Sequence, residues 1–182
     1  QLRGSAVHFS HREIEAGGLL GTAFSLLSAD ANLVLRHDAW GPMTSGGLGV
    51  RLQRRSYQFD GGVLTPDANE TSIAGFMLEE FEHGPLRLEG GLRYDWTRLT
   101  PAFMGSTPIG MIRPRTFGAV SSSIGALLQL GAGFGTGLNL GRAFRVPDVN
   151  DLYSRGPHLA VYRDERGNPD LDIEVGSGID FF

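Results

Sequence analysis

The sequence contains no cysteine, so it offers neither a disulfide scaffold nor a thiolate metal site. It also lacks any apolar run near the roughly 20 residues that a helical membrane span requires. The formal net charge is only −4, which argues against a nucleic-acid partner held by phosphate contacts. No basic segment followed by an apolar core opens the chain. We therefore see no signal peptide, and expect a mature chain or an interior piece of a longer one.

Glycine, in contrast, is plentiful: the 27 glycines among 182 residues are about twice the average usage of roughly 7%. They follow no three-residue period, which excludes a collagen-like chain. The Gly-rich stretch from Gly131 to Gly137 does not fit a dinucleotide-binding fingerprint, because Thr136 stands where the last glycine would be needed. Glycines that recur every second residue are better explained by one face of a β-strand.

Alternation of apolar and polar residues dominates the chain. Between Leu86 and Thr97, one set of alternate residues is apolar or aromatic and the other is mostly charged. Successive side chains of a strand point to opposite faces, so this segment predicts one apolar and one charged wall. The same alternation recurs at residues 48–53, 134–141 and 171–182, and noisier strand-like segments lie near 5–12, 19–36, 70–82 and 116–130.

The eight predicted strands are joined by connections of alternating length. Short links are expected at 37–42, 83–85 and 131–133, and long ones at 12–18, 57–69, 99–115 and 146–170. Transmembrane barrels show this asymmetry, with short turns on one side and long loops on the other. Most segments approach the 9–11 residues that a tilted strand needs to cross a bilayer. The fold class we predict is therefore all-β, an antiparallel transmembrane β-barrel.

The polar walls of these strands supply a charged set on what would be the barrel interior. The residues predicted to face the lumen are Arg51, Arg87, Glu89, Arg93 and Asp95. Polar interiors are usual in such barrels. No motif supports catalysis, because no nucleophile elbow or His-Glu-x-x-His sequence occurs and the carboxylates are spread along strands. We predict that the protein is not an enzyme.

The most distinctive stretch begins at Gly141 and runs to Glu174. A strand ends with Arg142 to Pro147, Asp151-Leu152-Tyr153 and Gly156-Pro157-His158 follow, and Gly167 to Leu171 leads into a return strand that we expect to start at Leu171. This order and spacing resembles the barrel domain of TonB-dependent outer-membrane receptors, and the resemblance is strongest over about residues 43–182. It implies that residues 1–182 form part of one barrel domain, about eight strands of about 22, without the plug domain and without the segment that contacts TonB. Barrels with 22 strands have a plugged lumen.

The resemblance implies a function in uptake of a scarce metal ion or metal chelate, of siderophore, haem, cobalamin or zinc type, across the bacterial outer membrane. The implied partners are the lipid of that membrane, the protein's own plug domain and the TonB complex. No cofactor is expected beyond a transported metal ion or metal chelate.

The long loop after Pro147 is the place where the implied ligand would bind. Its candidate residues are Asp148, Asp151, Tyr153, Arg155, His158 and Tyr162. His158, with carboxylates near it in sequence, is a candidate ligand for a borderline metal such as zinc. The competing interpretation is a solvated loop in which Gly156-Pro157 shapes a turn beside an incidental histidine.

Two other architectures remain open at this point. Eight strands are also the minimum for a complete small outer-membrane barrel. Alternation alone also describes a soluble β-sandwich or lipocalin-like binding module, in which the apolar face would be buried and the charged face wet.

Overall fold

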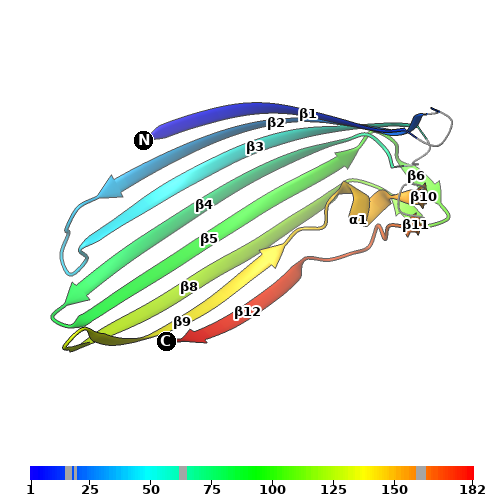
Figure 1. Ribbon diagram of the computed structural model, residues 1–182. Coiled ribbons are helices and arrows are strands. Elements are labelled where there is room, and N and C mark those ends of the chain that lie inside the picture. The colour runs from blue at the N-terminus through cyan, green and yellow to red at the C-terminus, as the bar shows by residue number, and fades with distance from the viewer. Residues whose placement is uncertain (15–17, 19, 62–64, 159–162) are drawn as a thin grey trace.

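The computed structural model describes residues 1–14, 18, 20–61, 65–158 and 163–182, and of His158 it describes only the backbone. Eight long strands form one antiparallel sheet in the order β1-β2-β3-β4-β5-β8-β9-β12 (Figure 1). The strands of this sheet are β1 (Leu2–Ile14), β2 (Leu20–His37), β3 (Ser45–Gly61), β4 (Ala68–His83), β5 (Leu86–Pro101), β8 (Arg115–Gly131), β9 (Phe134–Arg145) and β12 (Glu174–Phe181). The eight predicted strands and their antiparallel arrangement are confirmed.

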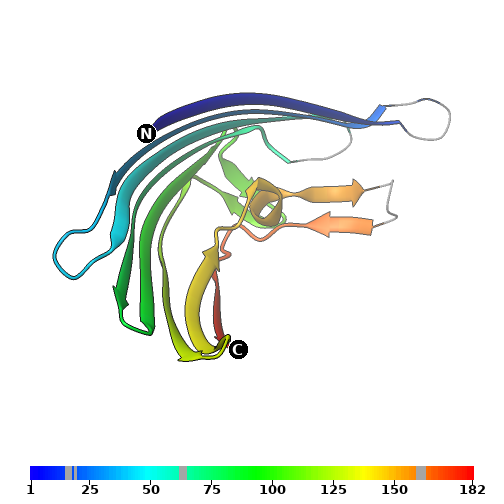
Figure 2. The same ribbon diagram turned by 60° about the vertical axis from the view of Figure 1, so that its left-hand side comes forward.

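The sheet is curved, and its two faces differ in chemistry. Consecutive residues of each strand alternate between the faces, and the cross-strand register aligns equivalent residues. The outward, convex face carries exposed apolar residues, among them Val50, Leu92, Tyr94 and Ile124. The opposite, concave face is the one that the segment around α1 (Val149–Tyr153) approaches (Figure 2). An exposed apolar outer face is the reverse of what a soluble sandwich requires.

The sheet is open among the described residues, with β1 at one edge and β12 at the other. A complete eight-stranded barrel would instead pair its first strand with its last, so that alternative is not what the structure shows. In the part of the chain that is described, no helix combines the length and apolar character needed to cross a membrane.

The predicted asymmetry of the connections holds from β4 onward but not before it, because the link between β2 and β3 (38–44), predicted short, is longer than the links at 15–19 and 62–67. Gly84 and Pro85 alone join β4 to β5, and Gly84 adopts a φ of 57°. The link between β8 and β9 turns through Gly131, Ala132 and Gly133, all with positive φ, so the glycines supply a conformation that side chains rarely adopt. At the other end of the sheet the connections from β5 to β8 and from β9 to β12 are long. We call this second end the loop end.

The loops contain more regular structure than the sequence indicated. The β5–β8 connection forms a small hairpin of β6 (Gly105–Thr107) and β7 (Gly110–Ile112), and the β9–β12 connection contains α1 and a hairpin of β10 (Arg155–His158) and β11 (Arg163–Arg166). These elements are too short to carry a periodic signal.

The prediction that the last strand starts at Leu171 is wrong, because β12 begins at Glu174. The Arg115 guanidinium donates hydrogen bonds to the carbonyls of Pro169 and Leu171, so these groups are held by a side chain from β8. The Leu171 N–H donates to the Asn168 carbonyl at 3.2 Å in a turn. The segment joins the sheet only where Glu174 pairs with Arg145 of β9.

Candidate functional site

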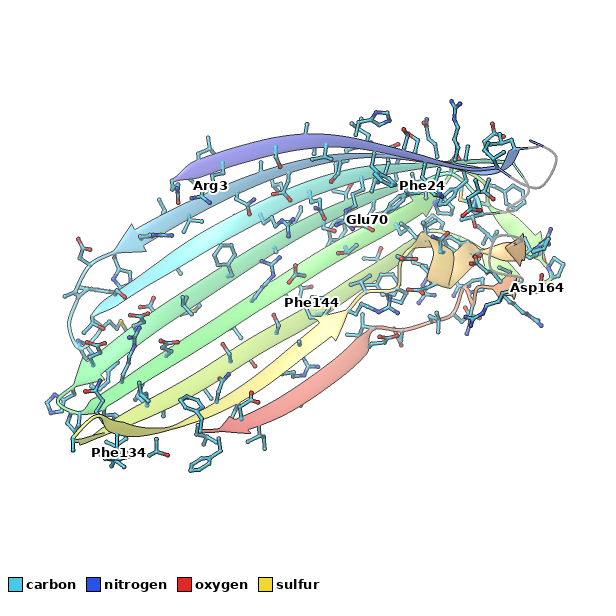
Figure 3. The ribbon with its side chains drawn as sticks, viewed as in Figure 1. Arg3, Phe24, Glu70, Phe134, Phe144 and Asp164 are labelled. Atoms are coloured by element: carbon cyan, nitrogen blue, oxygen red, sulfur yellow. The ribbon has the colours of Figure 1, made fainter. Side chains whose placement is uncertain are left out.

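The loop end holds the apolar core of the molecule. Side chains from the concave face of the strands meet side chains from α1 and β7, whereas most of the sheet buries little. The buried members of this group, which we call the loop-end cluster, are Tyr57, Ala68, Leu99, Ile112, Phe117, Val149, Leu152 and Tyr153. Figure 3 shows Phe24, which packs against the cluster, and Glu70 on the strands near this end, with Asp164 on the hairpin beyond them. Burial of large apolar side chains fixes the long β9–β12 connection against the strands.

Helix α1 begins with a capping box. Asp148 accepts hydrogen bonds from the backbone N–H groups of Asn150 at 2.8 Å and Asp151 at 3.0 Å, and the Asp151 carboxylate accepts from the Asp148 N–H at 3.1 Å. Such reciprocal bonds satisfy N–H groups that would otherwise lack partners at the start of a helix. Asp148 and Asp151, which the sequence suggested as ligand-binding residues, therefore stabilise the start of α1.

Arg145 connects this helix to both strands that flank the loop. Its guanidinium donates to Asp151 at 2.7 Å and to the two carboxylate oxygens of Glu174 at 2.9 and 3.0 Å. Arg145 ends β9 and Glu174 starts β12, and the two residues are directly opposite in the ladder. Opposite charges at the end of one strand and the start of the next are a sequence signal that could have revealed this link.

The return segment is locked to the helix through backbone contacts. The Gly167 N–H donates to the Ser154 carbonyl at 2.7 Å, and the Asn168 N–H donates to the Asp151 carbonyl at 2.9 Å. A Cβ at position 167 would lie 2.7 Å from the backbone of Leu152 and Tyr153. Only glycine allows the chain to pass this close to the helix.

Tyr153 is fully buried, and its hydroxyl donates to the Arg113 carbonyl at 2.5 Å. Burial raises the pKa of the Tyr153 hydroxyl above its ordinary value, because the phenolate would lose its hydration. Tyr153 therefore holds the β9–β12 connection against the neighbouring connection through packing and this hydrogen bond.

The other three candidate loop residues belong to β10 or to the segment that joins it to β11. Arg155 is half-buried at the start of β10. The backbone of His158 pairs with that of Arg163, while its side chain and all of Tyr162 lie outside the described residues. Among the described side chains no group of three histidines or carboxylates is arranged to hold a metal ion. The ligand roles predicted for these residues stay predictions.

The concave face carries the charged set expected from the sequence. The cross-strand register places Arg51, Arg87, Glu89, Arg93 and Asp95 on this one face. Each of them takes part in an ion pair: Arg51 with Asp30 at 2.6 Å, Arg87 with Glu80 and Glu89 at 3.1 Å each, and Arg93 with Asp95 at 2.6 Å.

Nearer the loop end, Glu70 is buried between Arg55 at 3.5 Å and the Tyr57 hydroxyl at 3.3 Å. The sequence alternation indicated which residues share the face, but not the pairing with Asp30 or Glu70, because those partners lie on strands with a weaker pattern.

A family profile described as "TonB dependent receptor-like, beta-barrel" matches residues 8–181. The chain belongs to the TonB-dependent receptor family. Its eight-stranded sheet is thus a section of the wall of such a barrel. The resemblance stated from the sequence is confirmed at the level of the family, which consists of outer-membrane transport receptors.

The fold is also similar to a solved structure, described as a double mutant of the Serratia marcescens hemophore receptor HasR in complex with its hemophore HasA and heme. The TM-score is 0.67 at 20% sequence identity, over 88% of this chain. The chain spans 29% of the length of that receptor. A comparison with curated protein sequences finds no significant match.

Proposed function

We propose that this chain forms part of the barrel wall of a bacterial outer-membrane receptor that takes up a metal ion or metal chelate by TonB-dependent active transport. The observation that carries the proposal is the family match over residues 8–181. The similarity to a receptor solved with a hemophore and heme supports a metal-bearing cargo in general terms. Among siderophore, haem, cobalamin and zinc cargoes we make no choice. The protein acts as a transporter and not as an enzyme.

The partners we propose follow from the two faces of the sheet. The convex face, with Leu48, Val50, Leu92 and Ile124 about half exposed, would lie against membrane lipid, because a contiguous apolar surface of this extent is not stable in water. The concave face, with its ion pairs around Arg51, would face a plug domain, to which the TonB complex couples.

The loop end is the surface that we propose for ligand capture. Asp148, Asp151 and Tyr153 would hold the β9–β12 connection in shape. Arg155, His158 and Tyr162 would then be the residues that reach the ligand, with His158 the candidate for a metal contact. This division of roles is supported by the capping box and by the burial of Tyr153.

A growth experiment tests the function. The gene for the full-length receptor is deleted from its bacterium, and cells receive ferric siderophore, haem, cobalamin or zinc as the sole source of that nutrient. We expect growth to fail on one of the four and to be restored by the intact gene only when TonB is present. Normal growth of the deletion strain on all four nutrients, or rescue without TonB, would contradict the proposal.

A further inference from the structure

A hollow of about 330 Å³ lies at the loop end, beside the loop-end cluster. It is a half-open hollow lined by the β3–β4 connection, the β5–β8 connection, Tyr153 of α1 and the start of β10. Its apolar lining includes Pro66, Phe103, Ile109 and Ile112. Three segments that are distant in sequence thus contribute to one concave site, as is typical of small-ligand sites.

Thr65 and Arg155 line this hollow and have no polar partner among the residues that the structure describes, but only Arg155 keeps exposed surface for a ligand, because the Thr65 hydroxyl oxygen is sealed from solvent. Thr65 is only 5% exposed, yet its hydroxyl makes no hydrogen bond there. Leaving a buried hydroxyl unpaired costs free energy, so such groups normally have partners. Arg155, half-buried in the same lining, forms no ion pair within the described part of the chain.

The remaining polar groups of the lining are occupied. The Thr107 hydroxyl donates to the Gly110 carbonyl at 2.8 Å, and the Tyr153 hydroxyl donates to the Arg113 carbonyl. Two arginines of the neighbouring segments are also engaged: Arg113 pairs with Asp170 at 2.8 Å, and Arg115 bonds to carbonyls of the return segment. As far as the described residues show, the hollow therefore presents one cation without an ion pair, Arg155, beside an apolar wall.

We propose that this hollow binds the carboxylate-bearing aromatic or aliphatic part of the receptor's ligand, and the inference rests on the function proposed above. Arg155 would hold the carboxylate through paired N–H donors, a geometry that suits guanidinium and carboxylate. The organic body would lie against Phe103 and Ile109. A volume of about 330 Å³ fits one such group, not a whole chelate.

The test uses full-length receptor in detergent and two probes of nearly equal shape, phenylacetate and its uncharged amide, phenylacetamide. Binding of each is measured by ligand-observed NMR titration. We expect phenylacetate to bind about tenfold more tightly, a difference of about 1.4 kcal/mol, since hydrogen bonds between charged groups are stronger than those to a neutral group. Arg155→Gln is expected to remove this preference while leaving phenylacetamide binding unchanged.

Arg163→Gln is the matched control. Arg163 lies in the same hairpin, but alternation along the paired strands places it on the face opposite Arg155. It should keep the full preference for phenylacetate.

Equal binding of the two probes to the wild-type receptor would overturn the inference, as would an equal loss in Arg163→Gln and Arg155→Gln. If TonB-dependent growth persists while either of these results is found, the proposed carboxylate site in the hollow is refuted and the receptor function stands. If TonB-dependent growth itself fails, the proposed function falls separately, because the probe titration does not depend on transport.

Discussion

The eight-stranded sheet away from the loop end, which we call the strand wall, and the loop end obtain their stability from different sources. In the wall, residues such as Val50 and Leu92 remain about half exposed, so their burial depends on what surrounds the protein. At the loop end, Leu99, Leu152 and Tyr153 are at most 1% exposed, and their burial is complete within the chain. The wall is held by ladders of backbone hydrogen bonds, and the loop end by side-chain packing and caps.

This difference fits the two surroundings, lipid and water, that we propose for the chain. The six strands between β1 and β12 have neighbours on both sides that pair with their backbone groups, which is what a lipid environment demands. A loop in water can satisfy backbone groups with solvent, so it needs a core of its own to keep one shape. Arg145 links the two parts, because it ends β9 and bonds to α1.

The largest expected effect is a loss of unfolding free energy when the strand wall is altered. Val50→Arg places a charge on the convex face, and lipid-facing arginine near the bilayer midplane costs about 2–4 kcal/mol. Gln53→Arg in the same strand is the control, because residue 53 is on the concave face beside Asp30. Urea unfolding of the full-length receptor in lipid vesicles measures both. Equal destabilisation by the two variants would show that the convex face does not meet lipid.

A smaller loss of stability is expected when the packing of the loop end is altered. Gly167→Ala brings a Cβ to 2.7 Å from the backbone of α1, and overpacking of this kind costs about 1–3 kcal/mol. We expect faster hydrogen exchange of the Asn168 N–H and of the α1 amides, with the strands unaffected.

The matched control for this change is Gly176→Ala in β12, where nothing lies within 4 Å of an added Cβ. That variant should keep slow exchange in α1. If Gly176→Ala loosens α1 as much as Gly167→Ala does, the close approach of the return segment is not what holds the helix.

The wall was the part that the sequence predicted well. Period-two alternation is long and regular in β5, where Leu92 and Arg93 fall on opposite faces as expected. A strand of 16 residues repeats its signal many times, so noise at single positions does not hide it. Register follows from the same alternation, because a shift by one residue would exchange the two faces.

The loop end was predicted poorly for physical reasons. Helix α1 has five residues and hairpin strands such as β10 have four, too few for a period to be recognised. The start of β12 was misplaced because the alternation continues through Leu171, although Arg115 holds that residue's carbonyl away from the sheet. The hollow around Thr65 could not be foreseen, since three separate connections form it.

The smallest expected effect is a pH dependence of the stability of the loop end that the strand wall should not share. Because burial raises the pKa of Tyr153, its neutral form stabilises the loop fully below about pH 10, and this contribution is lost as the pH rises above that value. Tyr153→Phe removes the hydrogen bond to Arg113, at a cost of about 0.5–1.5 kcal/mol at neutral pH. It should also remove the part of the loss of loop-end stability at high pH that ionisation of Tyr153 causes.

Hydrogen exchange of the α1 amides at pH 8 and pH 11 measures both effects, and the strand amides serve as the internal reference. An identical alkaline response in wild type and Tyr153→Phe would show that this hydroxyl does not couple loop packing to pH.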